Sequence, residues 1–110
     1  MAVVVSTLRI LTAPRSRAQV LRTLAAQVGP TRARPGCSRC DVYQDVESSD
    51  AIILVEEWSC QGDLNLRLRS DDYRAVLAAI ELAREPPVMH FDTVTRRAGL
   101  ETVASARGPV

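Results

Sequence analysis

The sequence predicts an α+β fold of the ferredoxin-like type, with the element order β-α-β-β-α-β. Three observations lead to this prediction. Four segments have the apolar pattern of strands, and segments with a helical period lie between the first and second and between the third and fourth of them. Proline and glycine residues fall between these segments. In this fold the four strands form one antiparallel sheet, and both helices cover the same face of it.

The composition is that of an ordinary globular protein. The 110 residues are 46% hydrophobic and 25% charged, with a formal net charge of +1. This balance lacks the basic excess that neutralises phosphates, so no nucleic-acid partner is expected. All 14 basic residues are arginine, which excludes Schiff-base chemistry on a lysine side chain. We expect one domain over residues 1–110, with its core in residues 2–95.

The first predicted strand spans residues 2–12 and stops before Pro14. Its apolar start has no basic region before it, is interrupted by Arg9 and is too short to span a membrane. We therefore expect a cytoplasmic protein without a membrane partner. The three cysteines are an odd number, and no disulfide framework is expected in that compartment.

The first predicted helix spans residues 15–28. Gly29 and Pro30 follow it and predict its end, because glycine is a common C-cap and proline cannot continue a helix. The apolar stripe of this helix repeats at i, i+3, i+4 and i+7 and consists of Leu21, Leu24, Ala25 and Val28.

Two strands are predicted next, over residues 37–46 and 51–60, with the polar segment 47–50 as the hairpin loop. Apolar side chains occupy both odd and even positions of these strands, which predicts a sheet buried on both faces. The predicted helices suffice for one face only. We therefore expect a homodimer in which two sheets pack through their open faces.

Asp63 is predicted to cap a short helix that ends near residue 69. Ser70 is predicted to cap a longer helix that ends before Pro86. Residues 88–95 form the fourth predicted strand. The extension over residues 96–110 either docks on the partner subunit or is a frayed end. Its weak apolar patch favours docking. The buried stripe of the longer helix is expected to be Tyr73, Val76, Leu77 and Ile80.

The register of the hairpin determines which side chains share a face. If Val46 pairs with Ala51, five polar or aromatic side chains lie on the face that the helices cover. Two facing carboxylates would raise the pKa of one of them if buried, which would give a proton acceptor; if solvated or paired with arginine, they would be structural. A slip of one residue would reverse these partners. The five are Arg39 opposite Trp58, Asp41 opposite Glu56, and Tyr43, which lies opposite Leu54.

Several short motifs lie between the third and fourth strands. They are Glu56-x-Trp58, Asp63-Leu64, Leu68-x-Ser70-x-x-Tyr73 and Pro87-x-x-x-Phe91, with Gly36 before the second strand. With these motifs and this element order, residues 2–95 resemble the antibiotic biosynthesis monooxygenase family of dimeric α/β barrels, which includes small quinol monooxygenases. The resemblance implies oxygenation of electron-rich phenols or quinols without metal or flavin, in a pocket between the helices and the sheet.

Two departures from the family pattern bear on the activity. Members commonly have histidine one position before Leu68, where this chain has Arg67, which can hold an anion but cannot move protons near neutral pH. Heme-degrading members have an axial histidine where this chain has Leu77, so heme breakdown is disfavoured. We expect a cofactor-independent monooxygenase that acts on a small quinol or phenolic aromatic. The alternative is a non-catalytic dimeric α/β barrel that binds a small apolar ligand.

Seven residues are candidates for the site under this resemblance. Glu56 or Asp41 would accept a proton. Trp58 would form a wall, and Tyr73 would donate a hydrogen bond; each of these could instead be an ordinary core or paired residue. The predicted substrate-binding residues are Arg39, Asp41, Arg67 and His90, of which His90 could instead be structural.

No metal site is expected. The three cysteines and His90 lack the paired spacing of a zinc ribbon. Cys37 and Cys40 are three residues apart on a predicted strand, and residues at that separation normally point to opposite faces. In the predicted register Cys37 lies across from Cys60.

Overall fold

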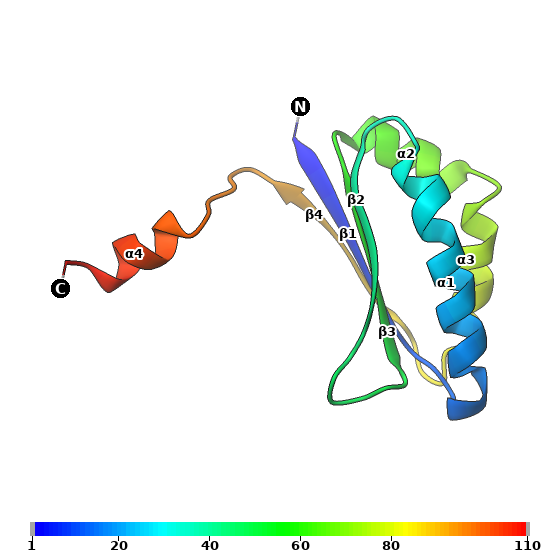
Figure 1. Ribbon diagram of the computed structural model, residues 1–110. Coiled ribbons are helices and arrows are strands. Elements are labelled where there is room, and N and C mark those ends of the chain that lie inside the picture. Colours follow the sequence, from blue (N-terminus) through cyan, green and yellow to red (C-terminus); the bar gives the residue numbers. More distant parts are fainter. Residues whose placement is uncertain (1, 110) are drawn as a thin grey trace.

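The computed structural model describes residues 2–109 and confirms the predicted α+β fold. Four antiparallel strands form one open sheet in the order β2-β3-β1-β4, and α1, α2 and α3 lie on one face of it (Figure 1). The elements are β1 (Val3–Leu11), the 3-10 turn η1 (Pro14–Ser16), α1 (Arg17–Arg32), β2 (Cys37–Gln44), β3 (Ala51–Trp58), α2 (Gln61–Arg69), α3 (Tyr73–Ile80), β4 (Val88–Val94) and α4 (Glu101–Arg107).

The core lies between the sheet and the three helices. In β1 every second residue is buried against the helices, because successive side chains of a strand point to opposite faces. The intervening residues of β1 are half-buried on the other face. The main core consists of Leu8, Ile10, Val20, Leu24, Cys40, Ile52, Leu54, Tyr73, Val76 and Ala79.

Helix α1 continues to Arg32, so the prediction that Gly29 and Pro30 end it is wrong. The proline removes one backbone donor, but contacts from outside the helix hold its last turn. Thr31 is buried, and Arg32 Nε donates a hydrogen bond to the carbonyl oxygen of Cys40 in β2 at 3.0 Å. Of the predicted stripe, Leu24 is buried, Leu21 and Val28 are partly buried and Ala25 is exposed, while Val20 and Thr31 are buried in addition.

The ends of α2 and α3 differ from the predicted caps. Helix α2 begins two residues before Asp63, whose carboxylate accepts hydrogen bonds from Ser59 Oγ at 2.5 Å and Cys60 Sγ at 3.3 Å. Ser70 Oγ donates to the carbonyl oxygen of Arg67 at 2.7 Å, so it closes α2 and does not cap α3. The buried face of α3 consists of Tyr73, Val76 and Ala79, with Ile80 partly buried and the predicted Leu77 exposed.

Gly36 has a structural reason to be glycine. Its φ of +84° lies in the left-handed region, which side chains other than glycine rarely adopt. A Cβ atom at this position would also overlap the carboxyl group of Asp63. The two motif positions are therefore in contact at the turn that leads into β2.

The hairpin of β2 and β3 has a register one residue away from the predicted one, so that prediction is wrong. Cys40 pairs with Glu56, and Val42 pairs with Leu54, on the face that the helices cover. Strand β2 ends at Gln44, and the loop is longer than predicted because Asp45 Oδ1 accepts a hydrogen bond from the backbone N–H of Glu47 at 2.8 Å. This register buries apolar side chains of β2 and places Arg39, Asp41 and Tyr43 on the open face.

A β-bulge interrupts β2 near its start. Cys37 pairs with Trp58, whereas Arg39 pairs with Glu57, so Ser38 is an extra residue. The bulge puts Cys37 and Cys40 on the same face, and the predicted opposite orientation of these two is wrong. Cys37 also lies across from Trp58 and not from Cys60. Within residues 2–109 no group of three histidine, cysteine or acidic residues is placed to hold a metal ion.

The face of the sheet opposite the helices is uncovered in the single chain (Figure 1). Apolar residues occupy much of its centre, while charged residues lie on its edge strands and on the central strands at Arg9 of β1 and Glu57 of β3. None of the helices in the described part of the chain is both long enough and apolar enough to cross a membrane. The central residues of this open face are Val3, Val5, Ile53 and Val55, and its edges carry Arg39, Asp41, His90 and Asp92.

Candidate active site

Four of the seven predicted site residues meet in one buried cluster between the sheet and the helices. Arg67 donates two hydrogen bonds to the Glu56 carboxylate, from Nε to Oε1 at 3.1 Å and from Nη2 to Oε2 at 3.2 Å. Trp58 Nε1 donates to Glu56 Oε1 at 3.2 Å. The guanidinium also lies 5.0 Å from the centre of the Tyr73 ring, which is the distance of a cation–π contact.

Local structure explains why these side chains converge. Glu56 and Trp58 are two residues apart on β3, so both point to the helices. Arg67 follows Leu64 by three residues on α2, so the two share the buried face of that helix. Tyr73 is the first residue of α3 and is directed inward by the turn that separates α2 from α3.

Water does not reach the ion pair of Arg67 and Glu56, whose side chains are 0% and 3% exposed. Gln27 on α1 provides a further acceptor, with its Oε1 at 3.3 Å from Arg67 Nη1. A buried charge costs several kcal/mol unless it is paired, so each partner needs the other. The guanidinium is thus occupied by groups of the protein, and the geometry does not support its predicted role in holding a substrate oxygen.

The cluster affects the titration of two neighbouring groups. Burial raises the pKa of the Tyr73 hydroxyl to about 12, and the negative charge of Glu56 adds to this shift while Arg67 opposes it. Burial likewise raises the pKa of the Cys40 thiol to about 12, and Glu56 again adds to the shift. Both groups are therefore neutral in the folded protein at neutral pH.

The free energy of unfolding is expected to fall between about pH 9 and pH 12. In this window the unfolded chain loses protons that the folded protein keeps on Tyr73 and Cys40, so each rise in pH favours unfolding. Urea unfolding at a series of pH values measures the effect. Tyr73→Phe removes one of the two groups and should make the fall between about pH 10 and 12 shallower. Parallel curves for wild type and Tyr73→Phe would contradict this assignment.

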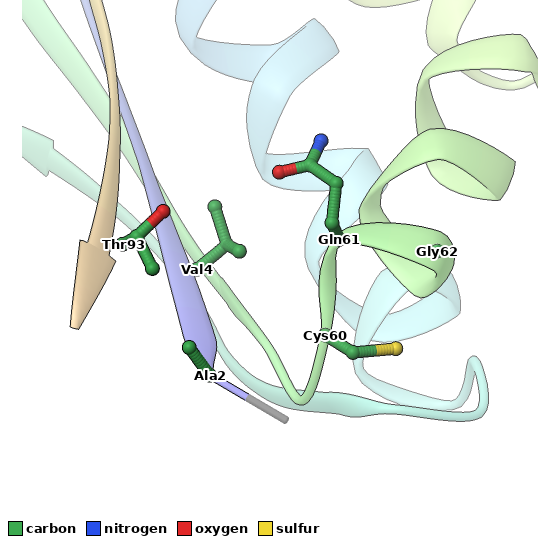
Figure 2. A pocket seen from close by; sticks show the side chains of 6 residues that line it. All are labelled: Ala2, Val4, Cys60, Gln61, Gly62 and Thr93. Atoms are coloured by element: carbon green, nitrogen blue, oxygen red, sulfur yellow. The ribbon is translucent and has the colours of Figure 1, made fainter. Parts of the chain in front are cut away.

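An open hollow of about 370 Å³ lies beside the cluster, between the start of β1, the end of β4 and the start of α2 (Figure 2). Among residues 2–109 its lining is mostly apolar and includes no charged side chain. Val4 lines the hollow and also packs with Trp58 and Leu64, so it separates the hollow from the buried cluster. The lining residues are Ala2, Val4, Cys60, Gln61, Gly62 and Thr93.

The three remaining predicted residues lie on the open face of the sheet, away from this cluster. Arg39 Nε is 2.8 Å from Asp41 Oδ2, and Arg39 Nη2 donates to the Tyr43 hydroxyl at 2.9 Å. Arg39, together with Arg32, holds the pKa of the Asp41 carboxyl below its usual value. His90 is exposed on β4 next to Thr7 of β1. The predicted facing carboxylates of Asp41 and Glu56 are therefore on opposite faces, and that arrangement is wrong.

Sequence reasoning missed Gln27 and the lining of the hollow. Gln27 follows the buried Leu24 by three residues, and this spacing predicts that the two share one face of α1. Gly62 and Thr93 had no comparable signal, because Gly62 is on α2 and Thr93 is on β4, and only the tertiary fold brings these two elements together.

Comparisons with known proteins agree with the fold and the motifs. The profile of the antibiotic biosynthesis monooxygenase family matches residues 1–79. Among solved structures, Rv0793 from Mycobacterium tuberculosis is 23% identical, with a TM-score of 0.80 over 88% of this chain and 99% of that chain. PA3566 from Pseudomonas aeruginosa is 24% identical, with a TM-score of 0.74 over 89% of this chain and 97% of that chain. A comparison with curated proteins finds no match.

Proposed function

This chain belongs to the antibiotic biosynthesis monooxygenase family, and on that premise we propose that it oxidises a small quinol or phenolic aromatic without a bound cofactor. The observation that carries the proposal is the hollow of about 370 Å³ beside Val4 and the buried Trp58. Its volume lies in the range of small-molecule sites, and its apolar lining suits an aromatic ring. The described lining residues carry no charge, which favours a neutral ligand.

The chemistry needs no reductant besides the substrate. When a quinol is converted to a hydroxyquinone, one atom of O₂ enters a ring C–H bond. The other atom leaves as water with the two hydrogens of the quinol hydroxyls. All four electrons that reduce O₂ come from the quinol, so the reaction is balanced without a flavin or a metal.

Two polar groups at the hollow are suited to hold the substrate oxygens. Gln61 Nε2 donates to Asn65 Oδ1 at 2.9 Å, which leaves its carbonyl oxygen to accept from a phenol. The Thr93 hydroxyl reaches the hollow from β4 (Figure 2). Trp58 supports the wall through Val4, and the ion pair of Glu56 and Arg67 holds Trp58 in place. In this proposal Glu56 and Arg67 act by holding Trp58 in place. They do not have the direct roles that the sequence predicted, which were proton acceptance by Glu56 and substrate binding by Arg67.

Filling the hollow is expected to abolish most of the activity. Gly62→Leu puts an aliphatic side chain into it, and the first added carbon would meet only Cys60 Sγ, at 3.8 Å. Gly29→Leu is the matched control, a helical glycine whose added carbon would have no neighbour within 4 Å. Oxygen uptake with a panel of one- and two-ring quinols should give a kcat/KM at least about tenfold lower for Gly62→Leu than for wild type. Gly29→Leu should match wild type.

Each part of this proposal can fail separately. Absence of oxygen uptake by the wild type across the panel contradicts the reaction. Equal kcat/KM for Gly62→Leu and wild type contradicts the location of the site. Loss of activity after dialysis against a chelator, with recovery on adding metal, contradicts cofactor independence.

A second function, binding of a small apolar ligand without turnover, is favoured by the saturation of the buried cluster. The polar groups of Glu56, Trp58 and Arg67 are bonded to one another, and none of them lines the hollow. Native mass spectrometry that shows a retained ligand, in a preparation without oxygen uptake, would establish this function.

A homodimer through the open face is part of the proposal. Val5, Ile53 and Val55 are only half-buried at the centre of this face in the single chain. An antiparallel sheet with helices on one side and apolar side chains on the other needs a second cover. A second copy of the chain provides a surface that matches this one by symmetry.

A further inference from the structure

Residues 95–109 form a C-terminal arm that leaves the sheet after β4 and runs on the side opposite to α1, α2 and α3 (Figure 1). All seven residues of α4, the helix of this arm, are exposed. Leu100, directly before α4, is 85% exposed, and Val103 is 55% exposed. Isolated helices shorter than about 12–15 residues are marginal in water, so α4 needs a surface to pack against.

The exposed area of the chain is larger than its size requires. It is 7091 Å², which exceeds the roughly 6,000 Å² of a compact monomer of 12.0 kDa by about 1,100 Å². The radius of gyration is 16.0 Å, against about 13 Å for a compact chain of this length. A standard interface covers about 800 Å² on each partner. The excess area is therefore sufficient for one subunit interface.

An ion pair fixes the start of the C-terminal arm against the open face. Arg97 Nη2 lies 2.9 Å from Glu57 Oε2, and Ser38 Oγ donates to the other carboxylate oxygen at 3.1 Å. The Glu57 side chain is 10% exposed and belongs to the open face of β3. A molecule packed on that face would lie beside the arm.

The charge of the C-terminal arm is opposite to that of the rest of the chain. Of the 14 arginines and 13 acidic residues in the sequence, the arm contains three arginines and one acid. The remainder therefore has one more acid than arginine. Opposite charge favours contact between the arm of one copy and the body of another.

From these observations we infer that the C-terminal arm docks on a second copy of this chain, with Leu100 and Val103 buried against that copy. The second copy is the one that packs on the open face in the proposed homodimer. The inference rests on the homodimer and not on the proposed reaction.

Sedimentation equilibrium of matched double variants tests the arm. The variant L100S/V103S removes the apolar side chains of the arm, and L66S/L77S removes two exposed leucines of α2 and α3, on the opposite side of the sheet. The wild type should be a dimer. The Kd of L100S/V103S should be at least about tenfold higher, and that of L66S/L77S unchanged. An unchanged Kd for L100S/V103S would overturn the inference.

Hydrogen exchange identifies what α4 docks on. Docking on a second copy predicts that the amides of α4 are protected above the Kd of the dimer and lose protection on dilution below it. Core amides of β1 are the internal control for a folded monomer. Protection of α4 that is independent of concentration means docking on its own chain, and absent protection at every concentration means a free end. Either result overturns the inference.

The outcomes separate this inference from the proposed function. A monomeric wild type would overturn the homodimer and the docking of the arm together. A dimer without oxygen uptake would leave the docking intact and contradict only the reaction.

Discussion

Replacing Arg67 by methionine is expected to lower the free energy of unfolding by about 3–5 kcal/mol at pH 7. Arg67 and Trp58 both donate to the Glu56 carboxylate in the wild type. The substitution leaves this buried carboxylate with the Trp58 N–H alone of these two donors. Equilibrium unfolding in urea, followed by the fluorescence of the single tryptophan, measures the loss. All variants are compared at one protein concentration, because the stability of a dimer depends on it.

Two control variants show whether burial is the cause. The double variant E56Q/R67M removes both charges and keeps an oxygen for the Trp58 N–H, so it should recover most of the loss. Arg74→Met breaks the ion pair between Arg74 and Asp71, whose side chains are 82% and 91% exposed. It should change the free energy of unfolding by less than about 0.5 kcal/mol. A loss below about 1 kcal/mol for Arg67→Met would contradict a buried and mutually dependent pair.

Replacing Trp58 by alanine is expected to destabilise the protein by about 3–5 kcal/mol. Trp58 is fully buried and packs with Val4 and Leu64, so the substitution leaves a cavity and frees one hydrogen-bond position of Glu56. The variant has no tryptophan, so its unfolding is followed by far-ultraviolet circular dichroism.

A graded series separates the packing of Trp58 from its hydrogen bond. Trp58→Phe keeps most of the ring contacts and removes the N–H donor, so its loss should be smaller than that of Trp58→Ala, at about 1–2 kcal/mol. Leu77→Ala is the exposed control and should cost less than about 1 kcal/mol. Equal losses for Trp58→Ala and Trp58→Phe would mean that the hydrogen bond, and not the packing, dominates.

The order of the elements was predictable because it depends on local properties of the chain. Period-two and helical patterns distinguish strands from helices, and prolines and glycines mark most of the boundaries. The family motifs are equally local, and they led to the family that the profile match then confirmed. The end of α1 was not predictable in this way, because the contact of Arg32 with β2 outweighs the signal of Gly29 and Pro30.

The candidate site was only partly predictable. The sequence singled out Glu56, Trp58, Arg67 and Tyr73, and these four are in contact. It could not show that Arg67 is the partner of Glu56, because the two are on different elements and an arginine is normally exposed. Arg39 and Asp41 were predicted on the wrong face because a local pattern does not determine the register of β2 against β3. His90 lies on β4, away from the cluster.

By itself, then, the sequence determined the fold class, the family and the four residues of the buried cluster. Tertiary structure alone decided the strand register, the bulge at Ser38, the pairing of Arg67 with Glu56 and the position of the hollow. The physical reason is the range of the interactions. Periodicity and turn chemistry act within a few residues of the chain. The register of β2 against β3 depends on contacts between separate strands, and a shift of one residue changes which side chains of β2 face the core without changing any local sequence pattern.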